Sequence, residues 1–146
     1  MTFTLRPATP SDEAFLYSLH IVTMRESVSA TWGWDGESQK QRFATSFAPE
    51  RTSVILVSGV CAGMIEIDPG PSELFIRNLK ILPQFQGAGL GTEILRRVIS
   101  SAANDGLSVR LQVLRANTRA RQLYVRLGFK ESGRTATHIQ MGLLAN

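Results

Sequence analysis

The chain has 146 residues, a formal net charge of +4 at pH 7, and 43% hydrophobic residues. This length supports one domain with a sizeable core, and the hydrophobic share excludes a disordered tail. No stretch approaches the roughly 20 apolar residues that a membrane span needs. With no apolar leader and one cysteine, Cys61, we expect a single cytoplasmic domain over residues 1–146, without a disulfide within the chain.

Arginine supplies most of the positive charge, with thirteen arginines against three lysines. Arginine suits phosphate recognition, but a GC-rich genome that encodes Arg in place of Lys is the better explanation. Nucleic-acid binders concentrate their charge in one patch, and these arginines are spread over ordinary helix and strand patterns. The composition therefore favours no nucleic-acid partner, although a nucleic-acid or ribosome-associated protein stays an alternative.

The N-terminal third predicts one strand and two helices. Phe3–Arg6 alternates like a short strand, and Thr9–Asp12 supplies an N-cap, a proline at the first helical position and an acid in the first turn. A helix is predicted to follow, and its successive turns are marked by Phe15, Leu19, Val22 and Glu26. After a loop that contains Trp32 and Trp34, a second helix is predicted from about Ser38 to Phe47.

The middle of the chain predicts three strands. Residues 53–57 and 61–67 form a hairpin around Ser58-Gly59, and 73–82 return as a longer strand after a turn at 68–72. In that strand Leu74 and Ile76 share one face, whereas Leu79 and Ile81 have the opposite parity. The slip favours a β-bulge near Arg77-Asn78. Since Phe75 is apolar too, an unbroken strand is the alternative.

The C-terminal part alternates between helix and strand. An apolar stripe from Leu90 to Ala102 predicts a helix that ends at Asn104–Gly106, and Val109–Val113 follow as a strand. Ala120–Leu127 form another amphipathic helix with Gly128 as its terminator, and Thr137–Leu143 form the last strand. The order predicts an α/β or α+β domain with a mixed sheet of about six to seven strands and about four helices.

The strongest chemical signal lies between a strand and a helix, at Gln86–Thr92. Three glycines in five positions let a ligand approach the backbone, and the helix that follows offers unpaired N–H groups and a positive dipole end. These features predict a phosphate or pyrophosphate site. A tight turn for close packing would explain one glycine, but not three.

Two nucleotide motifs fail on spacing. The dinucleotide pattern G-x-G-x-x-G, counted from Gly87, needs a glycine where Thr92 stands, and it usually opens the first strand–helix unit of its fold. A P-loop needs Gly followed by Lys and Ser or Thr, and the turn contains no such pair.

The turn does match Gln-x-x-Gly-x-Gly, as Gln86, Gly89 and Gly91. Here the chain resembles the GNAT superfamily of N-acetyltransferases, whose signature for the pyrophosphate of acetyl-CoA has this spacing. The resemblance covers nearly the whole chain. Its other segments are Leu5–Asp12, Asn78–Pro83, Val113–Asn117 and Ala120–Phe129.

The resemblance implies a centrally splayed sheet, with the pantetheine arm of acetyl-CoA between the splayed strands. Backbone groups of Ile81 and Leu82 would pair with pantetheine, and Asn117 would bind the cofactor arm or cap the next helix. The pyrophosphate would be held by the amides of Gln86, Gly87, Ala88, Gly89, Leu90, Gly91 and Thr92.

The implied reaction transfers an acetyl group from acetyl-CoA to a primary amine by direct attack in a ternary complex. A backbone N–H near Ile81 would stabilise the oxyanion, and Tyr124 would protonate the leaving thiolate as general acid. Tyr124 also fits a core aromatic residue. The candidates for general base are Glu73 and His138, each of which also fits a solvated strand residue, and a water chain is the alternative.

In similar proteins the first two helices form the acceptor wall, which here contains Glu26, Trp32 and Trp34. These tryptophans fit a binding surface or a plug between helix and sheet equally well. The acceptor is expected to be a small-molecule or peptide amine. Similar proteins often form homodimers. No metal is expected, since one Cys and two distant His offer no ligand spacing. A non-catalytic acyl-CoA-binding module of the same fold is the alternative function.

Overall fold

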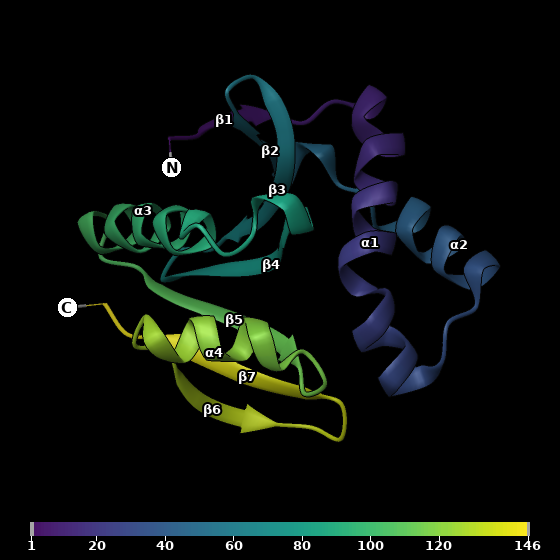
Figure 1. Ribbon diagram of the computed structural model, residues 1–146. Coiled ribbons are helices and arrows are strands. Elements are labelled where there is room, and N and C mark those ends of the chain that lie inside the picture. Colours follow the sequence, from purple (N-terminus) through teal and green to yellow (C-terminus); the bar gives the residue numbers. More distant parts are fainter. Residues whose placement is uncertain (1, 146) are drawn as a thin grey trace. The chain divides into compact units, whose positions relative to one another are not determined.

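The computed structural model describes residues 2–145, which contain seven β-strands and four α-helices (Figure 1). The strands form a mixed open sheet in the order β1-β2-β3-β4-β5-β7-β6. The predicted fold class is therefore confirmed. The chain divides into two compact units, Met1–Glu66 with Asn78–Leu90 (unit 1), and Ile67–Arg77 with Gly91–Asn146 (unit 2). The boundary runs through β3 and β4, and the single domain over 1–146 stays a prediction.

Unit 1 is built on an antiparallel arrangement of strands with two helices. It contains β1 (Thr4–Pro7), β2 (Thr52–Val57), most of β3 (Val60–Pro69) and the end of β4 (Glu73–Ile81). The helices are α1 (Glu13–Trp32) and α2 (Gly36–Ser46), which lie side by side (Figure 1). Their common core is formed by Ala8, Leu16, Leu19, Val54 and Met64.

Local signals explain how the elements of unit 1 begin and turn. The Asp12 carboxylate accepts a hydrogen bond from the backbone N–H of Thr9 at 2.8 Å, and Pro10 opens the short 3-10 helix η1 (Pro10–Asp12) that leads into α1. In the β2–β3 hairpin, Ser58 and Gly59 both have positive φ, 51° and 77°, as a tight two-residue turn requires. Both predictions are confirmed.

One expectation about α1 is wrong. Of the residues that mark its turns, Leu19 is buried and Val22 is 55% exposed, and Leu16 is buried beside Leu19. Trp32 was expected in a loop, but α1 continues to Trp32 and ends at Gly33, whose φ is 82°. The helix extends this far because Gly33 is the first residue whose backbone leaves the helical region.

Unit 2 contains the rest of the sheet and the other two helices. The first residues of β4 pair with β5 (Ser108–Leu114) in parallel, and β5 pairs antiparallel with β7 (His138–Leu143). The helices are α3 (Leu90–Asn104), of which all but the first residue belongs to this unit, and α4 (Thr118–Arg126). As predicted, the buried face of α3 is made of Leu90, Ile94, Leu95, Val98 and Ala102.

One strand of unit 2 was absent from the predicted elements. β6 (Lys130–Arg134) pairs antiparallel with β7, with a register shift between Glu131 and Gly133. Its sequence, Lys-Glu-Ser-Gly-Arg, has no apolar residue, since it is an edge strand whose side chains are mostly exposed. Such a strand is formed by its hydrogen bonds to β7 and leaves no period-2 hydrophobic pattern.

The predicted bulge near Arg77-Asn78 concerns the middle of β4. The β4–β5 ladder runs from Glu73 opposite Ser108 to Ile76 opposite Leu111, so the observed pairs stop directly before Arg77. Buried positions in β4 are Ile76 and Lys80, which have the same parity. The bulge itself stays a prediction. In residues 2–145, no helix is both long and apolar enough to cross a membrane.

Candidate active site

The glycine-rich turn joins the short 3-10 helix η3 (Pro83–Phe85) to α3. Gly87 and Gly89 both have φ of +84°, a region that side-chain-bearing residues rarely adopt, and no atom lies within 4 Å of the position of an added Cβ at either glycine. Leu90 is 1% exposed and anchors the first turn of α3 in the core. The exposed backbone of this turn therefore leads directly into the N-terminus of a 15-residue helix. This arrangement suits an anionic phosphate group.

Gln86 has a structural role that the sequence did not reveal. Its Nε2 donates a hydrogen bond to the backbone carbonyl of Ile81 at 2.6 Å, so the side chain ties the turn to the end of β4. Phe85 N–H donates to Leu82 O at 2.9 Å and closes η3 beside it. The Gln86 side chain is thus occupied within the chain, and its backbone N–H donates to Pro83 O at 3.1 Å. The expected pyrophosphate contact of the Gln86 amide is therefore not available in this structure, and the amides from Gly87 to Thr92 stay a prediction.

The backbone at the end of β4 is partly engaged within the chain. The N–H of Leu82 donates to Ala62 O at 2.8 Å. Pairing of backbone groups of Ile81 and Leu82 with pantetheine stays a prediction. Successive N–H groups of a strand point to opposite sides. By this alternation the N–H of Ile81 is directed away from β3, and its role as an oxyanion donor stays a prediction.

Tyr124 combines burial with a hydroxyl that has no partner. The residue is 7% exposed on α4, and its ring packs edge-on against Phe129 with centroids 5.8 Å apart. Burial raises the pKa of the phenol to about 12. Within residues 2–145 no group accepts a hydrogen bond from this hydroxyl. The proton thus remains on the oxygen at neutral pH and is not engaged by the protein.

Asn117 caps α4, as one of its two interpretations predicted. Its Oδ1 accepts a hydrogen bond from Ala120 N at 3.3 Å, which satisfies one of the free donors of the helix N-terminus. A role of Asn117 toward the cofactor stays a prediction.

The two candidate bases lie in unit 2 in different surroundings. The Glu73 carboxylate is 3.9 Å from Arg110 Nη1, and both side chains are 45% exposed. His138 opens β7, and its Nδ1 is 2.7 Å from the Thr137 hydroxyl; burial lowers its pKa. Neither side chain is deeply buried, and the role of each as a base stays a prediction.

The three expected acceptor-side residues lie on α1 and on the segment that follows it, and their role toward an acceptor stays a prediction. Trp34 packs against His20, with ring centroids 5.9 Å apart, and the Arg25 guanidinium lies 5.4 Å from the Trp34 ring centroid. Trp32 is 59% exposed at the end of α1, and Glu26 is exposed on the same helix. Asp35 accepts from the backbone amides of Glu37 and Ser38, so this carboxylate caps α2.

Sequence reasoning missed a buried polar cluster in unit 1. Lys80 is 7% exposed, and its Nζ lies 3.0 Å from His20 Nδ1. Burial lowers the pKa of Lys80 to about 8, against the opposing effect of the Glu66 charge. Glu66, also 7% exposed, accepts from Asn78 Nδ2 at 2.8 Å and from Arg51 Nη2 at 3.3 Å. The sequence signal that could have revealed this cluster is Lys80 itself, a lysine between the apolar residues Leu79 and Ile81 of the predicted strand.

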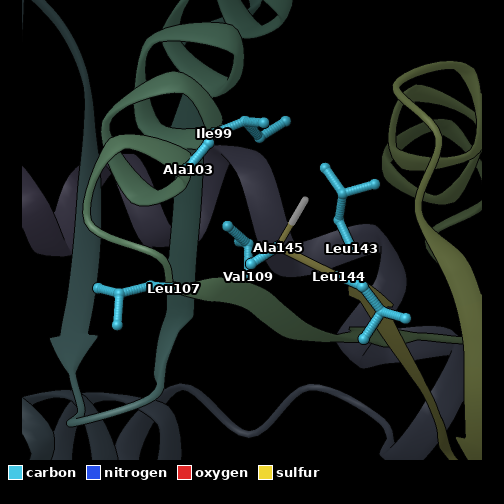
Figure 2. A pocket seen from close by; sticks show the side chains of 7 residues that line it. All are labelled: Ile99, Ala103, Leu107, Val109, Leu143, Leu144 and Ala145. Carbon is cyan, nitrogen blue, oxygen red and sulfur yellow. The ribbon is translucent and has the colours of Figure 1, made fainter.

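Unit 2 also holds a small pocket of about 110 Å³ (Figure 2). Side chains from the end of α3, the start of β5 and the C-terminal residues point into it, and they carry no polar group. The lining residues are Ile99, Ala103, Leu107, Val109, Leu143, Leu144 and Ala145. No candidate site residue belongs to it, so it is separate from the site. Residues 2–145 contain no group of three His, Cys, Asp or Glu arranged for a metal ion.

Comparison with curated proteins finds acetyltransferases. The chain is 37% identical over 59 residues to thialysine N-ε-acetyltransferase from Mus musculus and 34% identical over 59 residues to the same enzyme from Bos taurus. Each match covers 40% of this chain and 35% of the relative. The chain thus matches about a third of the length of these relatives.

Solved structures show the same fold over almost the whole chain. PaiA N-acetyltransferase from Thermoplasma acidophilum, in complex with coenzyme A, matches with a TM-score of 0.75 at 17% identity and covers 99% of both chains. An acetyltransferase from Thermus thermophilus matches with a TM-score of 0.77 at 19% identity, over 99% of this chain and 97% of the other. A sequence profile described as the Acetyltransferase (GNAT) family matches residues 14–129. With this match spanning most of the sequence, from α1 to the end of α4, the chain belongs to the GNAT acetyltransferase family.

Proposed function

We propose that the chain transfers an acetyl group from acetyl-CoA to a primary amine by direct attack of the amine on the thioester. The observation that carries this proposal is the turn Gln86–Thr92, where two glycines with φ of +84° expose the backbone beside the N-terminus of α3. Backbone N–H groups and a positive helix end bind phosphate without a cationic side chain. The turn would bind the pyrophosphate of acetyl-CoA.

The chemistry needs an oxyanion donor and an acid. Attack of the amine nitrogen on the thioester carbonyl carbon gives a tetrahedral oxyanion, for which the Ile81 N–H is the proposed donor. The C–S bond then breaks, and the thiolate takes a proton. Tyr124 is the proposed acid, since its hydroxyl stays protonated and has no partner among residues 2–145.

The acceptor side is proposed to include α1 and the segment that follows it. Trp34 with Arg25 and His20 forms a partly exposed aromatic and basic surface in unit 1. The names of the curated relatives specify thialysine, so thialysine and lysine belong in the first acceptor panel. A small alkylamine, a free amino acid and a peptide with a free N-terminus complete it.

Calorimetric titration of the purified protein with acetyl-CoA, CoA and NADH is the first test. We expect both CoA species to bind and NADH not to bind. The amine panel is then screened for release of CoA thiol and for acetylated product. Binding without turnover on any amine would support the acyl-CoA-binding module in place of the enzyme. Absence of binding to both CoA species would contradict both functions.

For the general base, pH–rate profiles of Glu73→Gln and His138→Ala separate the two candidates. An acidic limb that moves in one variant would identify that residue as the base. If neither variant moves the limb, both assignments are wrong.

A further inference from the structure

Lys80 on β4 is a buried lysine of unit 1 that the proposed reaction does not yet use. It is 7% exposed, and its Nζ lies 5.9 Å from the centroid of the Phe43 ring of α2. Within residues 2–145, no carboxylate lies within ion-pair distance of this nitrogen. Lysines are almost never buried in this way unless they are paired. The position therefore calls for an explanation other than an ordinary surface charge.

A chain of hydrogen bonds fixes how Lys80 meets His20. Gln39 Oε1, which can only accept, lies 2.9 Å from His20 Nε2, so Nε2 carries the ring hydrogen. His20 Nδ1 is then the acceptor, and Lys80 Nζ donates to it at 3.0 Å. As a neutral amine, Lys80 would keep one lone pair that this contact does not occupy. The arrangement of a reactive group, a partner and an orienting third residue is typical of acid–base sites.

The groups around Lys80 hold its protonated and neutral forms close in free energy. From α1, His20 faces it with a pKa lowered first by burial and then by the Lys80 charge, and Tyr17 lies behind His20. From β3, the Glu66 charge acts in the opposite direction to burial on the pKa of Lys80, with Arg51 behind Glu66. A pKa of about 8 places proton exchange at Lys80 near physiological pH.

The aromatic side chains beside the Lys80–His20 pair lie partly at the surface of unit 1. His20, Trp34 and Phe43 are each only half-buried, although they pack on one another.

We propose that Lys80, oriented by His20 and Gln39, is the group that takes the proton from the acceptor amine. This inference rests on the proposed N-acetyltransferase function. An N–H bond of the acceptor ammonium breaks, and its proton joins the lone pair of Lys80 Nζ. The freed lone pair of the acceptor nitrogen forms the bond to the thioester carbonyl carbon. The C–S bond breaks, and the thiolate takes the proton of the proposed acid Tyr124. The nitrogen releases its second proton to solvent, from which Tyr124 takes a proton back. Lys80 returns its proton to solvent after product leaves.

The test compares Lys80→Met and Lys80→Arg with Lys40→Met, which removes an exposed lysine of α2 as a matched control. We measure kcat and KM with the amine that the acceptor screen yields. Because arginine keeps the charge but does not lose its proton, both Lys80 variants should lose about 100-fold in kcat. The KM for acetyl-CoA should stay unchanged, and Lys40→Met should match the wild type. Activity restored by Lys80→Arg would overturn the proposal, since Lys80 would then act only by its charge.

A pH profile separates a proton acceptor from a structural residue. Glu66→Gln removes the charge that raises the pKa of Lys80, so the acidic limb of kcat should move to lower pH. The pKa of the acceptor amine is the same in both enzymes, so any shift belongs to the protein. If Glu66→Gln does not fold, Gln39→Leu is measured instead. This substitution removes the hydrogen bond that fixes the tautomer of His20, so the acidic limb of kcat should also move. If the variants fold and the acidic limb of kcat stays at the pH of the wild type, the proposal is overturned.

The proposed function and the role of Lys80 are contradicted by different outcomes. A wild-type protein that binds no acetyl-CoA and acetylates no amine contradicts the proposed function, and this inference falls with it. A wild-type protein that does both, while Lys80→Met keeps its turnover, contradicts only the role of Lys80. Calorimetric binding of acetyl-CoA to each variant confirms that a loss of turnover does not come from unfolding.

Discussion

The backbone N–H of Phe129 donates to the carbonyl of Tyr124 at 3.1 Å, and the rings of these two residues meet edge-on at 5.8 Å. Gly128, with φ of 96°, stands between the helix end and Phe129, and its N–H donates to Val125 O at 3.0 Å. Together these bonds form a Schellman ending with its apolar contact. The end of α4 therefore holds the ring of the proposed acid in place.

Tyr124→Phe should lower kcat by about 100-fold and leave the affinity for acetyl-CoA unchanged. The substitution removes only the hydroxyl, so the contact with Phe129 and the helix ending remain. Steady-state kinetics and calorimetric titration measure the two effects separately. Because the pKa of Tyr124 is about 12, no basic limb from this residue is expected below about pH 10. An unchanged kcat would make Tyr124 a core aromatic residue only.

Gly89→Val should weaken acetyl-CoA binding by about tenfold or more. A β-branched residue at φ of +84° is strained, and it places a side chain on the exposed backbone of the turn. Gly106→Val is the matched control. Gly106 also has a positive φ, 69°, and no atom lies within 4 Å of an added Cβ, but it is outside the glycine-rich turn. Calorimetry should show a loss of binding in the first variant alone. Equal binding in both variants would mean that the turn does not hold the cofactor.

Asn117→Ala should lower the free energy of unfolding by about 1 kcal/mol, because α4 loses its N-cap. Asn117→Ser should largely restore stability, since serine caps about as well as asparagine. Thermal or urea unfolding measures both variants. We expect equal affinity for acetyl-CoA throughout. Weaker binding in both variants, with stability restored in the serine variant, would assign Asn117 to the cofactor as well.

Trp34→Ala should raise the KM for the acceptor by about tenfold with little change in the KM for acetyl-CoA. Trp34 packs against His20 and carries Arg25 over its ring, so its loss disturbs the proposed acceptor surface. Trp32→Ala is the companion variant at the exposed end of α1. Acceptor kinetics that do not change in Trp32→Ala would remove this residue from the acceptor wall.

The amino-acid sequence by itself determined the elements and the turn. The stripe of α3, the alternation of β5, the cap at Thr9–Asp12 and the endings at Gly106 and Gly128 all follow from interactions within a few residues along the chain. The positive φ of Gly87 and Gly89 is also a local property, since it depends on the absence of a side chain at each residue. For this reason the glycine-rich turn could be found without a structure, while its binding of phosphate stays a prediction.

Tertiary structure decided what lies far apart in the sequence. Lys80 meets His20 across 60 positions, and Glu66 of β3 meets Arg51, which directly precedes β2, across 15 positions, so neither contact leaves a periodic signal. The edge strand β6 and the exposure of Val22 also depend on which neighbours cover each face. Burial sets the pKa of Lys80 and of Tyr124, and burial exists only after packing. The local pattern thus specified the backbone of the site, while packing specified the acid–base properties of its side chains.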